Sequence, residues 1–219
     1  MTTAVVLALD TSSAAIVTGI GSVDSDIQIL AQRCTVNARA HGELLAPSIS
    51  ACLADAGVTV DELDAVVAGV GPGPFTGLRV GLVTAAAFGD ALSIPTYGVC
   101  SLDAIAVGLD EPSLLVATDA RRREVYWARY VAGRRVAGPA VSRPADIEPG
   151  DVAAMAGAGA RLYADVLGLP LRNADYPTPR ALVGLAADRT IGHAPSEPLT
   201  PLYLRRPDVA APHAPKAVL

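Results

Sequence analysis

The sequence predicts an α/β protein of two related lobes, each with a βββαβα order of elements, of which the second is degenerate. Each half of the chain opens with an apolar strand that ends on an aspartate, Asp10 in the first half and Asp119 in the second. Short turns and further strands follow each opening strand, a pattern typical of an antiparallel meander. The first half then alternates helices with strands, a pattern that predicts parallel crossovers.

The first half has a clear signal for each element. We expect strands at 4–9, 14–21, 27–36, 65–70 and 95–100, and helices at 43–56, 77–92 and 102–108. In the first of these helices, Leu45, Ile49, Cys52 and Ala56 recur at three- and four-residue spacing, and Gly57 supplies a C-terminal stop. Thr59 and Glu62 have the spacing of a capping box, which predicts a short turn of helix before the strand at 65–70.

The second half restarts in the same way and then weakens. Strands are expected at 114–118, 124–131 and 136–141, a further strand within 152–160, and helices at 161–167 and 180–191. We therefore predict an N-terminal lobe at 1–109, a degenerate C-terminal lobe at 110–206 and a flexible tail at 207–219. Two such halves indicate the duplicated architecture of actin, Hsp70 and the sugar kinases, in which the opening hairpins hold nucleotide phosphates between the lobes.

Composition and charge narrow the function classes. Hydrophobic residues make up 51% of the chain and charged residues 18%, which indicates a globular protein. A net charge of −5 argues against a protein that grips nucleic acid on its own, because such binding needs a basic field. Basic clusters at 121–123, 134–135 and 205–206 are interpreted as solvated hairpin tips and chain ends. An RNA contact inside a larger assembly stays open.

The cysteines and the apolar runs indicate a cytoplasmic, soluble protein. Cys34, Cys52 and Cys100 are isolated within apolar stretches, which favours reduced, buried thiols over disulfides or a zinc ribbon. The N-terminal segment lacks the basic start of a signal peptide. No apolar run approaches the roughly 18 residues that a membrane span requires, so no membrane association is expected.

A glycine-rich stretch, GVGPGPFTGLRVG at 69–81, joins a predicted strand to a predicted helix. Such a loop can cradle phosphate on backbone N–H groups at a helix N-terminus. No Gly-Lys-Ser/Thr follows, and Pro72 and Pro74 remove N–H donors that a cradle needs. As a phosphate site the signal is weak.

The helix after this loop carries a ridge of small residues. Gly77, Gly81, Ala85 and Gly89 are spaced by four and share one face. Glycine inside a helix costs about 1 kcal/mol relative to alanine, so a close backbone approach is expected along the ridge. The neighbour is either the protein's own sheet or a helix of a partner, and spacing by itself does not choose between them.

Candidate catalytic and metal-binding residues are few. Asp10 could position a metal–phosphate group, but Ser12 and Ser13 stand where phosphate-binding turns want glycine, which favours a capped hairpin turn. His41 has Leu45 four residues on, so it lacks a second histidine on its helix face. His193 and His213 lie in proline-rich segments. We predict no catalytic residue, no metal site and no cofactor of the chain's own.

Several segments together resemble the TsaB (YeaZ) family of tRNA threonylcarbamoyladenosine biosynthesis. The resemblance rests on LALDTSS at 7–13, HGELLAP at 41–47, GPGPFTGLRVG at 71–81, Ser101-Leu102, DARRREVYW at 119–127 and PLYLR at 201–205. It spans nearly the whole chain. Pro74 is a departure, because the family usually has serine there, and it weakens a phosphate role further.

The resemblance implies a non-catalytic subunit that binds and activates a TsaD-like catalytic subunit in forming N6-threonylcarbamoyladenosine at tRNA position 37. It implies a TsaE-like ATPase as a further partner, contact with tRNA only through the complex, and a nucleotide, if any, shared at the partner interface. It also implies that the small-residue ridge faces a partner. The implied interface residues lie on the helices at 43–56 and 77–92, or just before the first: His41, Leu44, Leu45, Ile49, Cys52, Gly77, Leu78, Gly81, Leu82, Ala85, Phe88 and Gly89.

Two questions remain open at this level. The free protein could form a homodimer through the same helical face. The alternative function is an ATP-dependent phosphotransferase of the same fold, which would need glycine phosphate turns that the sequence lacks. A metallopeptidase is excluded for want of ligands.

Overall fold

The computed structural model describes residues 3–205, and the predicted tail at 207–219 lies outside them. The elements of the first half are β1 (Ala4–Asp10), β2 (Ala15–Val23), β3 (Ile27–Val36), α1 (His41–Ala56), η1 (Val60–Glu62), β4 (Ala65–Gly69), α2 (Phe75–Leu92), β5 (Thr96–Val99) and α3 (Ser101–Ala106). Those of the second half are β6 (Ser113–Asp119), β7 (Val125–Val131), β8 (Arg134–Ser142), η2 (Pro144–Asp146), β9 (Ala154–Ala156), α4 (Ala158–Leu162), α5 (Ala164–Leu167) and α6 (Pro179–Ile191).

The first sheet has five strands in the order β3-β2-β1-β4-β5. The opening three strands pair antiparallel, β1 with β2 and β2 with β3, because turns of a few residues can join only antiparallel neighbours. Strand β4 pairs parallel to β1 and β5 pairs parallel to β4, and the connections that lead into β4 and β5 run through α1 and α2. The predicted meander and crossovers are both confirmed.

The second sheet repeats the meander in the order β8-β7-β6-β9. Only Ala154–Ala156 of the predicted strand at 152–160 is extended, and α4 begins at Ala158. Gly157 has φ 102°, and a side chain at Gly159 would collide with the backbone of Thr118. These two glycines end the strand early and let the short helix α4 lie directly against β6. The predicted fold class, two α/β lobes with a degenerate second lobe, is confirmed.

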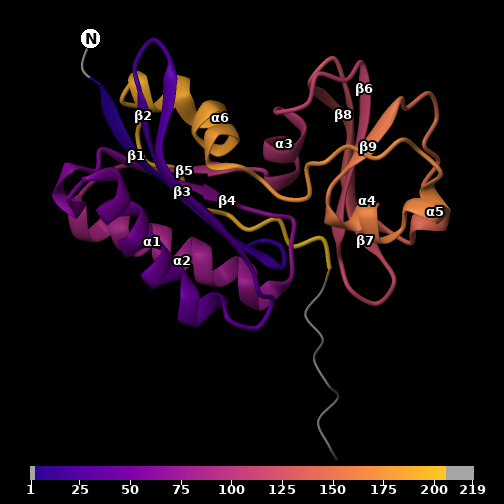
Figure 1. The fold of residues 1–219 in the computed structure, drawn as a ribbon, viewed down its shortest axis with the longest axis horizontal. Coiled ribbons are helices and arrows are strands. Elements are labelled where there is room, and N and C mark those ends of the chain that lie inside the picture. The colour runs from indigo at the N-terminus through magenta and orange to yellow at the C-terminus, as the bar shows by residue number, and fades with distance from the viewer. Residues whose placement is uncertain (1–2, 206–219) are drawn as a thin grey trace, which may run out of the picture.

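Helices cover the first sheet on two sides. Figure 1 shows α1 and α2 as one layer below the sheet and α6 above it. Helix α6 packs against all five strands of the first sheet. The predicted lobe boundary of 110–206 is therefore wrong at its C-terminal end, since the chain returns to the first lobe. The periodicity of α6 could not reveal this, because an apolar face does not specify which sheet it covers.

Each face of the first sheet has its own core. On the α1–α2 side, Leu7, Leu9, Ile49, Leu78 and Ala85 pack together with further aliphatic residues. On the other side, Val6, Ala8 and Val67 pack against Leu182 and Val183 of α6. Alternate residues of β1 serve opposite cores, as the two-residue period of a strand requires. This explains why β1 reads as a continuous apolar run rather than an alternating one.

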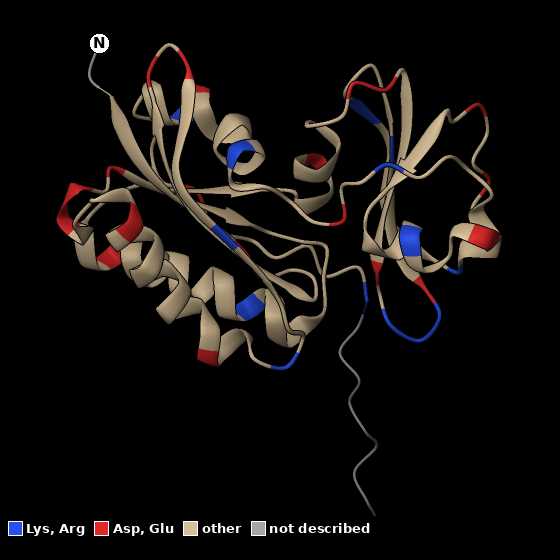
Figure 2. Cartoon of the chain, viewed as in Figure 1, with Lys and Arg blue, Asp and Glu red and all other residues tan. Residues whose placement is uncertain are grey.

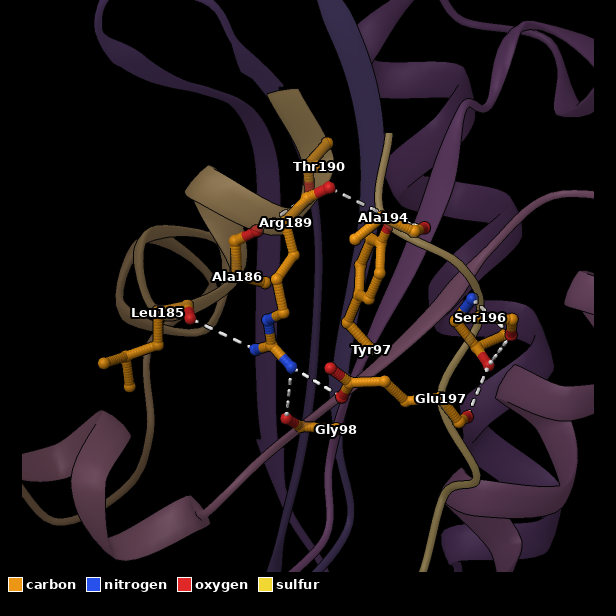
Figure 3. A network of polar contacts seen from close by, with 10 residues as sticks. Tyr97, Gly98, Leu185, Ala186, Arg189, Thr190, Ala194, Ser196 and Glu197 are labelled. Carbon is orange, nitrogen blue, oxygen red and sulfur yellow. Dashed lines mark hydrogen bonds and ion pairs between the residues drawn. The ribbon is translucent and has the colours of Figure 1, made fainter. Parts of the chain in front are cut away.

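After α6 the chain forms a C-terminal strap, residues 193–205, along the free edge of β5. The Ser196 hydroxyl accepts a hydrogen bond from the Thr96 N–H (3.1 Å), and the Glu197 N–H donates to the Thr96 carbonyl (2.9 Å). Figure 3 shows Arg189 reaching from α6 to Glu197 and to the Gly98 carbonyl. The strap thus satisfies an edge that would otherwise expose unpaired backbone groups.

Two expectations from composition need correction. Cys34 is exposed on the edge strand β3 and Cys100 is partly exposed, so only Cys52 is the buried thiol that was expected of all three. Helix α2 has 18 residues and by length and composition alone is apolar enough to cross a membrane, a test that the core helix of a soluble protein also passes. Within the described residues it is the one helix that meets this test. Its buried face lies on the first sheet.

Candidate functional site: the Asp10 turn and the α1–α2 layer

Asp10 lies at the carboxyl end of β1 and is the residue that the sequence offered as a candidate to position a metal–phosphate group. Its side chain is fully buried. One carboxyl oxygen accepts hydrogen bonds from the Ser12 N–H (2.9 Å) and the Ser12 hydroxyl (2.8 Å). The other accepts one from the Ser101 hydroxyl. The carboxyl group is thus engaged on both oxygens by its own protein.

Burial raises the pKa of Asp10 above its ordinary value, while the hydrogen bonds from Ser101 and Ser12 and the nearby His41 oppose that rise. A group that holds a hydrated metal–phosphate complex needs an ionised and accessible carboxylate. Asp10 is neither solvent-facing nor favoured in its ionised form. The predicted capped hairpin turn describes this residue better than a nucleotide ligand.

The glycine-rich loop occupies the space in front of this turn. Gly71 is held by Ser101, whose hydroxyl accepts the Gly71 N–H (3.2 Å) and whose own N–H donates to the Gly71 carbonyl (2.8 Å). Gly73 lies so close to Ser12 that a side chain there would overlap the Ser12 backbone. The loop therefore packs on the Asp10 turn with backbone, and its glycines serve this packing.

His41 fastens the same turn from the other side. Its Nε2 atom lies 2.9 Å from the Ser13 carbonyl oxygen, to which it donates when that nitrogen carries the proton. The side chain is buried at the start of α1. Among residues 3–205, no three His, Cys, Asp or Glu side chains gather in a way that could hold a metal ion. Here His41 has a structural contact rather than a partner-facing one.

The small-residue ridge of α2 faces the protein's own sheet. The Thr11 hydroxyl donates to the Gly77 carbonyl (2.7 Å) and accepts from the Gly81 N–H (2.9 Å). A methyl group at Gly81 would collide with Thr11, and one at Gly89 would collide with Thr96. The glycines admit a threonine hydroxyl between two turns of the helix. The expectation that this ridge meets a partner helix is therefore wrong.

Most of the residues implied as an interface are interior. Ten are buried, namely His41, Leu45, Ile49, Cys52, Gly77, Leu78, Gly81, Leu82, Ala85 and Gly89. Leu44 and Phe88 are half-buried at the rim of the first core. Apolar residues at three- and four-residue spacing form the face of a helix that packs inside the protein. The interface was therefore predicted on the buried face of both helices.

The outer face of the α1–α2 layer carries exposed apolar residues that were not predicted from the sequence. Val83 is 67% exposed, Ala87 is exposed, and Val80 and Thr84 are partly exposed beside them. On α1 the exposed residues include Ala46, Pro47 and Ser50. The stretch from Val80 to Gly89 has no charged residue at all. The sequence signal for this surface was that α2 is apolar on both faces, whereas a helix face that meets only solvent is polar.

The fold and this site define the class of protein. The chain is an α/β protein of two lobes that each open with an antiparallel meander, and its own backbone and hydroxyl groups pack around Asp10 at the end of β1. Its remaining distinctive surface is the outer face of α1 and α2, where α2 carries no charged residue from Val80 to Gly89.

Comparisons with known proteins agree with this class. The family model described as TsaD, tRNA N6-adenosine threonylcarbamoyltransferase, matches residues 29–188. An uncharacterized protein of Mycobacterium tuberculosis (strain ATCC 25618 / H37Rv) is 53% identical over 93% of this chain and 92% of its own length. Of a longer relative in Mycobacterium leprae (strain TN), the chain spans 55%.

Two further comparisons give the family a name. The tRNA threonylcarbamoyladenosine biosynthesis protein TsaB of Escherichia coli (strain K12) is 31% identical over 57% of this chain and 54% of its own length. The solved structure of YeaZ from Pseudomonas aeruginosa aligns with a TM-score of 0.76 and 28% identity, covering 92% of this chain and 100% of that one. The chain belongs to the TsaB (YeaZ) family, which is involved in tRNA threonylcarbamoyladenosine biosynthesis.

Proposed function

We propose that this chain is a non-catalytic subunit that binds and activates a TsaD-like catalytic subunit in the formation of N6-threonylcarbamoyladenosine on tRNA. The observation that carries the proposal is the sealed Asp10 turn. A catalytic member of this architecture needs open space for phosphates at that place, and here the Gly71–Pro74 loop and Ser12 fill it. The phosphotransferase alternative gains no support from the geometry of this turn.

The partner surface that we propose is the outer face of α1 and α2, with Val83 and Ala87 at its centre. It replaces the buried ridge, because a docking surface has to be exposed in the free subunit. The uncharged stretch from Val80 to Gly89 suits the core of a specific interface, from which charged groups are depleted. A TsaE-like ATPase joining the pair, a homodimer through the same face before the partner arrives, and a cytoplasmic site of action belong to this proposal.

The interface is tested with two matched tryptophan variants. Ala87→Trp places a large ring at the centre of the proposed face, and Ala145→Trp places the same ring on an exposed alanine of η2 in the second lobe. Each is co-expressed with the TsaD-like protein of the same cell and assayed by size-exclusion chromatography and calorimetry. We expect Ala87→Trp to weaken binding by roughly tenfold or more, as at an interface hot spot, and Ala145→Trp to bind normally.

Catalysis is tested in the same preparations. The isolated chain should hydrolyse no ATP and modify no tRNA, and adding it to the TsaD-like subunit should raise threonylcarbamoyl transfer. ATP turnover by the isolated chain above that of an Asp10→Ala control would contradict a non-catalytic role. Equal binding by both tryptophan variants would move the interface away from α2.

A further inference from the structure

The tip of the β6–β7 hairpin carries three consecutive arginines, Arg121, Arg122 and Arg123, which we term the arginine turn. All three are exposed, and all three have left-handed backbone conformations, with φ of 63°, 54° and 62°. Glycine or asparagine would adopt these angles with less strain. Three consecutive arginines at such positions point to a role for their side chains.

The turn is held in place by its own hydrogen bonds. The Arg121 N–H donates to Asp119 (2.8 Å), the Glu124 N–H donates to the Arg121 carbonyl (3.0 Å), and the Ala120 N–H donates to the Glu124 carbonyl (3.0 Å). These bonds fix the backbone from which the arginine side chains project. Such pre-organisation lowers the entropy lost when a ligand is bound.

The two acidic residues that flank the turn are already engaged. Glu124 pairs with Arg205 of the strap, which also donates to the Ala120 carbonyl (2.9 Å). One carboxylate oxygen of Asp119 accepts the hydrogen bond from the Arg121 N–H, and the other lies 3.4 Å from the Arg121 guanidinium. Within the described part of the chain, the Arg123 side chain has no ion pair. The turn therefore keeps an excess of positive charge.

A cavity of about 170 Å³ lies beside the turn, between the two lobes. Gly73, Pro74 and Phe75 line it from the first lobe, Tyr203 and Leu204 from the strap, and all its charged lining residues are arginines (Arg121, Arg122 and Arg205). This volume is below the roughly 300 Å³ at which pockets for whole small molecules begin. It suits one anionic group of a larger ligand better than a free nucleotide.

We propose that the arginine turn and this cavity contact the phosphodiester backbone of an RNA. Guanidinium groups bind phosphate oxygens in a bidentate way, and an RNA strand presents successive phosphates to neighbouring arginines. The proposal rests on the function proposed above, in which the assembly acts on tRNA. It goes further in assigning this chain a direct contact with the RNA.

The distribution of charge explains how an acidic protein can do this. The net charge of −5 keeps most of the surface unattractive to RNA. Figure 2 shows acidic segments gathered at the far left end of the first lobe, while the loop at the lower end of the second lobe is blue. The RNA is therefore attracted at one end of the molecule.

The test measures the binding of a fluorescein-labelled RNA stem-loop to the full chain by fluorescence anisotropy over a series of low salt concentrations. Arg123→Gln is compared with Arg134→Gln, which removes one exposed arginine from the β7–β8 hairpin at the opposite end of β7. We expect Arg123→Gln to weaken binding several-fold and to lower the salt slope by about one, with Arg134→Gln close to the wild type. Equal effects of the two variants, or no binding by the wild type, would overturn the proposal.

A second variant separates binding from folding. Arg121→Gly/Arg123→Gly removes both charges and also relieves the left-handed strain, so its melting temperature should stay level or rise while RNA binding falls. An unchanged RNA affinity in this variant would sink the idea. Displacement of the RNA by ATP at equal phosphate concentration would likewise assign the site to a nucleotide. Binding to the TsaD-like subunit should be unaffected, so failure of that interface is seen independently.

Discussion

At the scale of single residues, Asp10 and Thr11 give the turn after β1 a structural role. Asp10 is locked by Ser12 and Ser101, and Thr11 enters the backbone of α2 between Gly77 and Gly81. Both side chains point into the protein.

The raised pKa of Asp10 makes a prediction about stability and pH. A carboxyl whose pKa is higher in the folded than in the unfolded chain stabilises the fold only while protonated in both states. Its burial then costs stability as pH rises from about 4, the unfolded pKa, through the raised folded value. Asp10→Asn stays neutral and can still accept from Ser12, so its stability relative to the wild type should improve across this window.

Denaturant melts of both proteins between about pH 4 and about pH 8 measure this difference, which should level off above the folded pKa. Asp165→Asn, which changes an exposed acid of α5, provides the control. A wild-type advantage that grows with pH would mean that the ionised carboxylate is the stabilised form, and the cause assigned to the shift would be wrong.

At the scale of elements, helix α2 has two faces with different neighbours. The ridge from Gly77 to Gly89 packs on β1 and β5, and the face with Val83 and Ala87 is open. The helix N-terminus also carries an aromatic contact, because Phe75 stacks on Tyr203 of the strap with ring centroids 4.9 Å apart. The Arg79 guanidinium lies 3.7 Å from the centre of the Phe75 ring and donates to the Tyr203 hydroxyl (2.9 Å).

Ala85→Trp tests the assignment of the two faces. Ala85 is fully buried in the first core, so a tryptophan there overpacks the space between α2 and the sheet. We expect a loss of about 1–3 kcal/mol or more in the free energy of unfolding, seen as a lower melting temperature. The Ala87→Trp variant, two residues along the same helix, should melt like the wild type. A stable Ala85→Trp protein would reinstate the ridge as an exposed surface.

At the scale of the whole molecule, the strap joins the lobes by crossing from α6 to the hairpin of the second sheet. The Tyr97 hydroxyl fixes its start by donating to the Ala194 carbonyl (2.7 Å) and to the Arg189 carbonyl (3.2 Å). Further along, the Leu202 N–H donates to the Val70 carbonyl (2.9 Å). Arg205 then reaches Ala120 and Glu124 of the second lobe. Relative motion of the lobes is thus limited by a segment that belongs to neither sheet.

Tyr97→Phe should loosen this strap without unfolding the lobes. The change leaves the Ala194 carbonyl without this donor, while the Arg189 carbonyl keeps its hydrogen bond from the Ala194 N–H (2.9 Å). Such a loss costs about 1–3 kcal/mol when the carbonyl stays buried. Hydrogen exchange followed by mass spectrometry should show faster exchange across 193–205 and little change in β1 or β6. Tyr163→Phe, on a partly exposed tyrosine in the second lobe, is the matched control. Unchanged protection of the strap would show that its backbone pairing with Thr96 suffices.

By itself the sequence determined the elements, their order and the family. Strand and helix periods, the stop at Gly57 and the two aspartates that end β1 and β6 are local signals, because short-range backbone geometry produces them. The same signals predicted that Asp10 caps a turn. Only the tertiary structure decided which sheet α6 covers, which face of α2 is buried and how near Gly73 comes to Ser12. Those outcomes depend on contacts between segments far apart in the chain, and periodicity can mark a packed face without naming its neighbour.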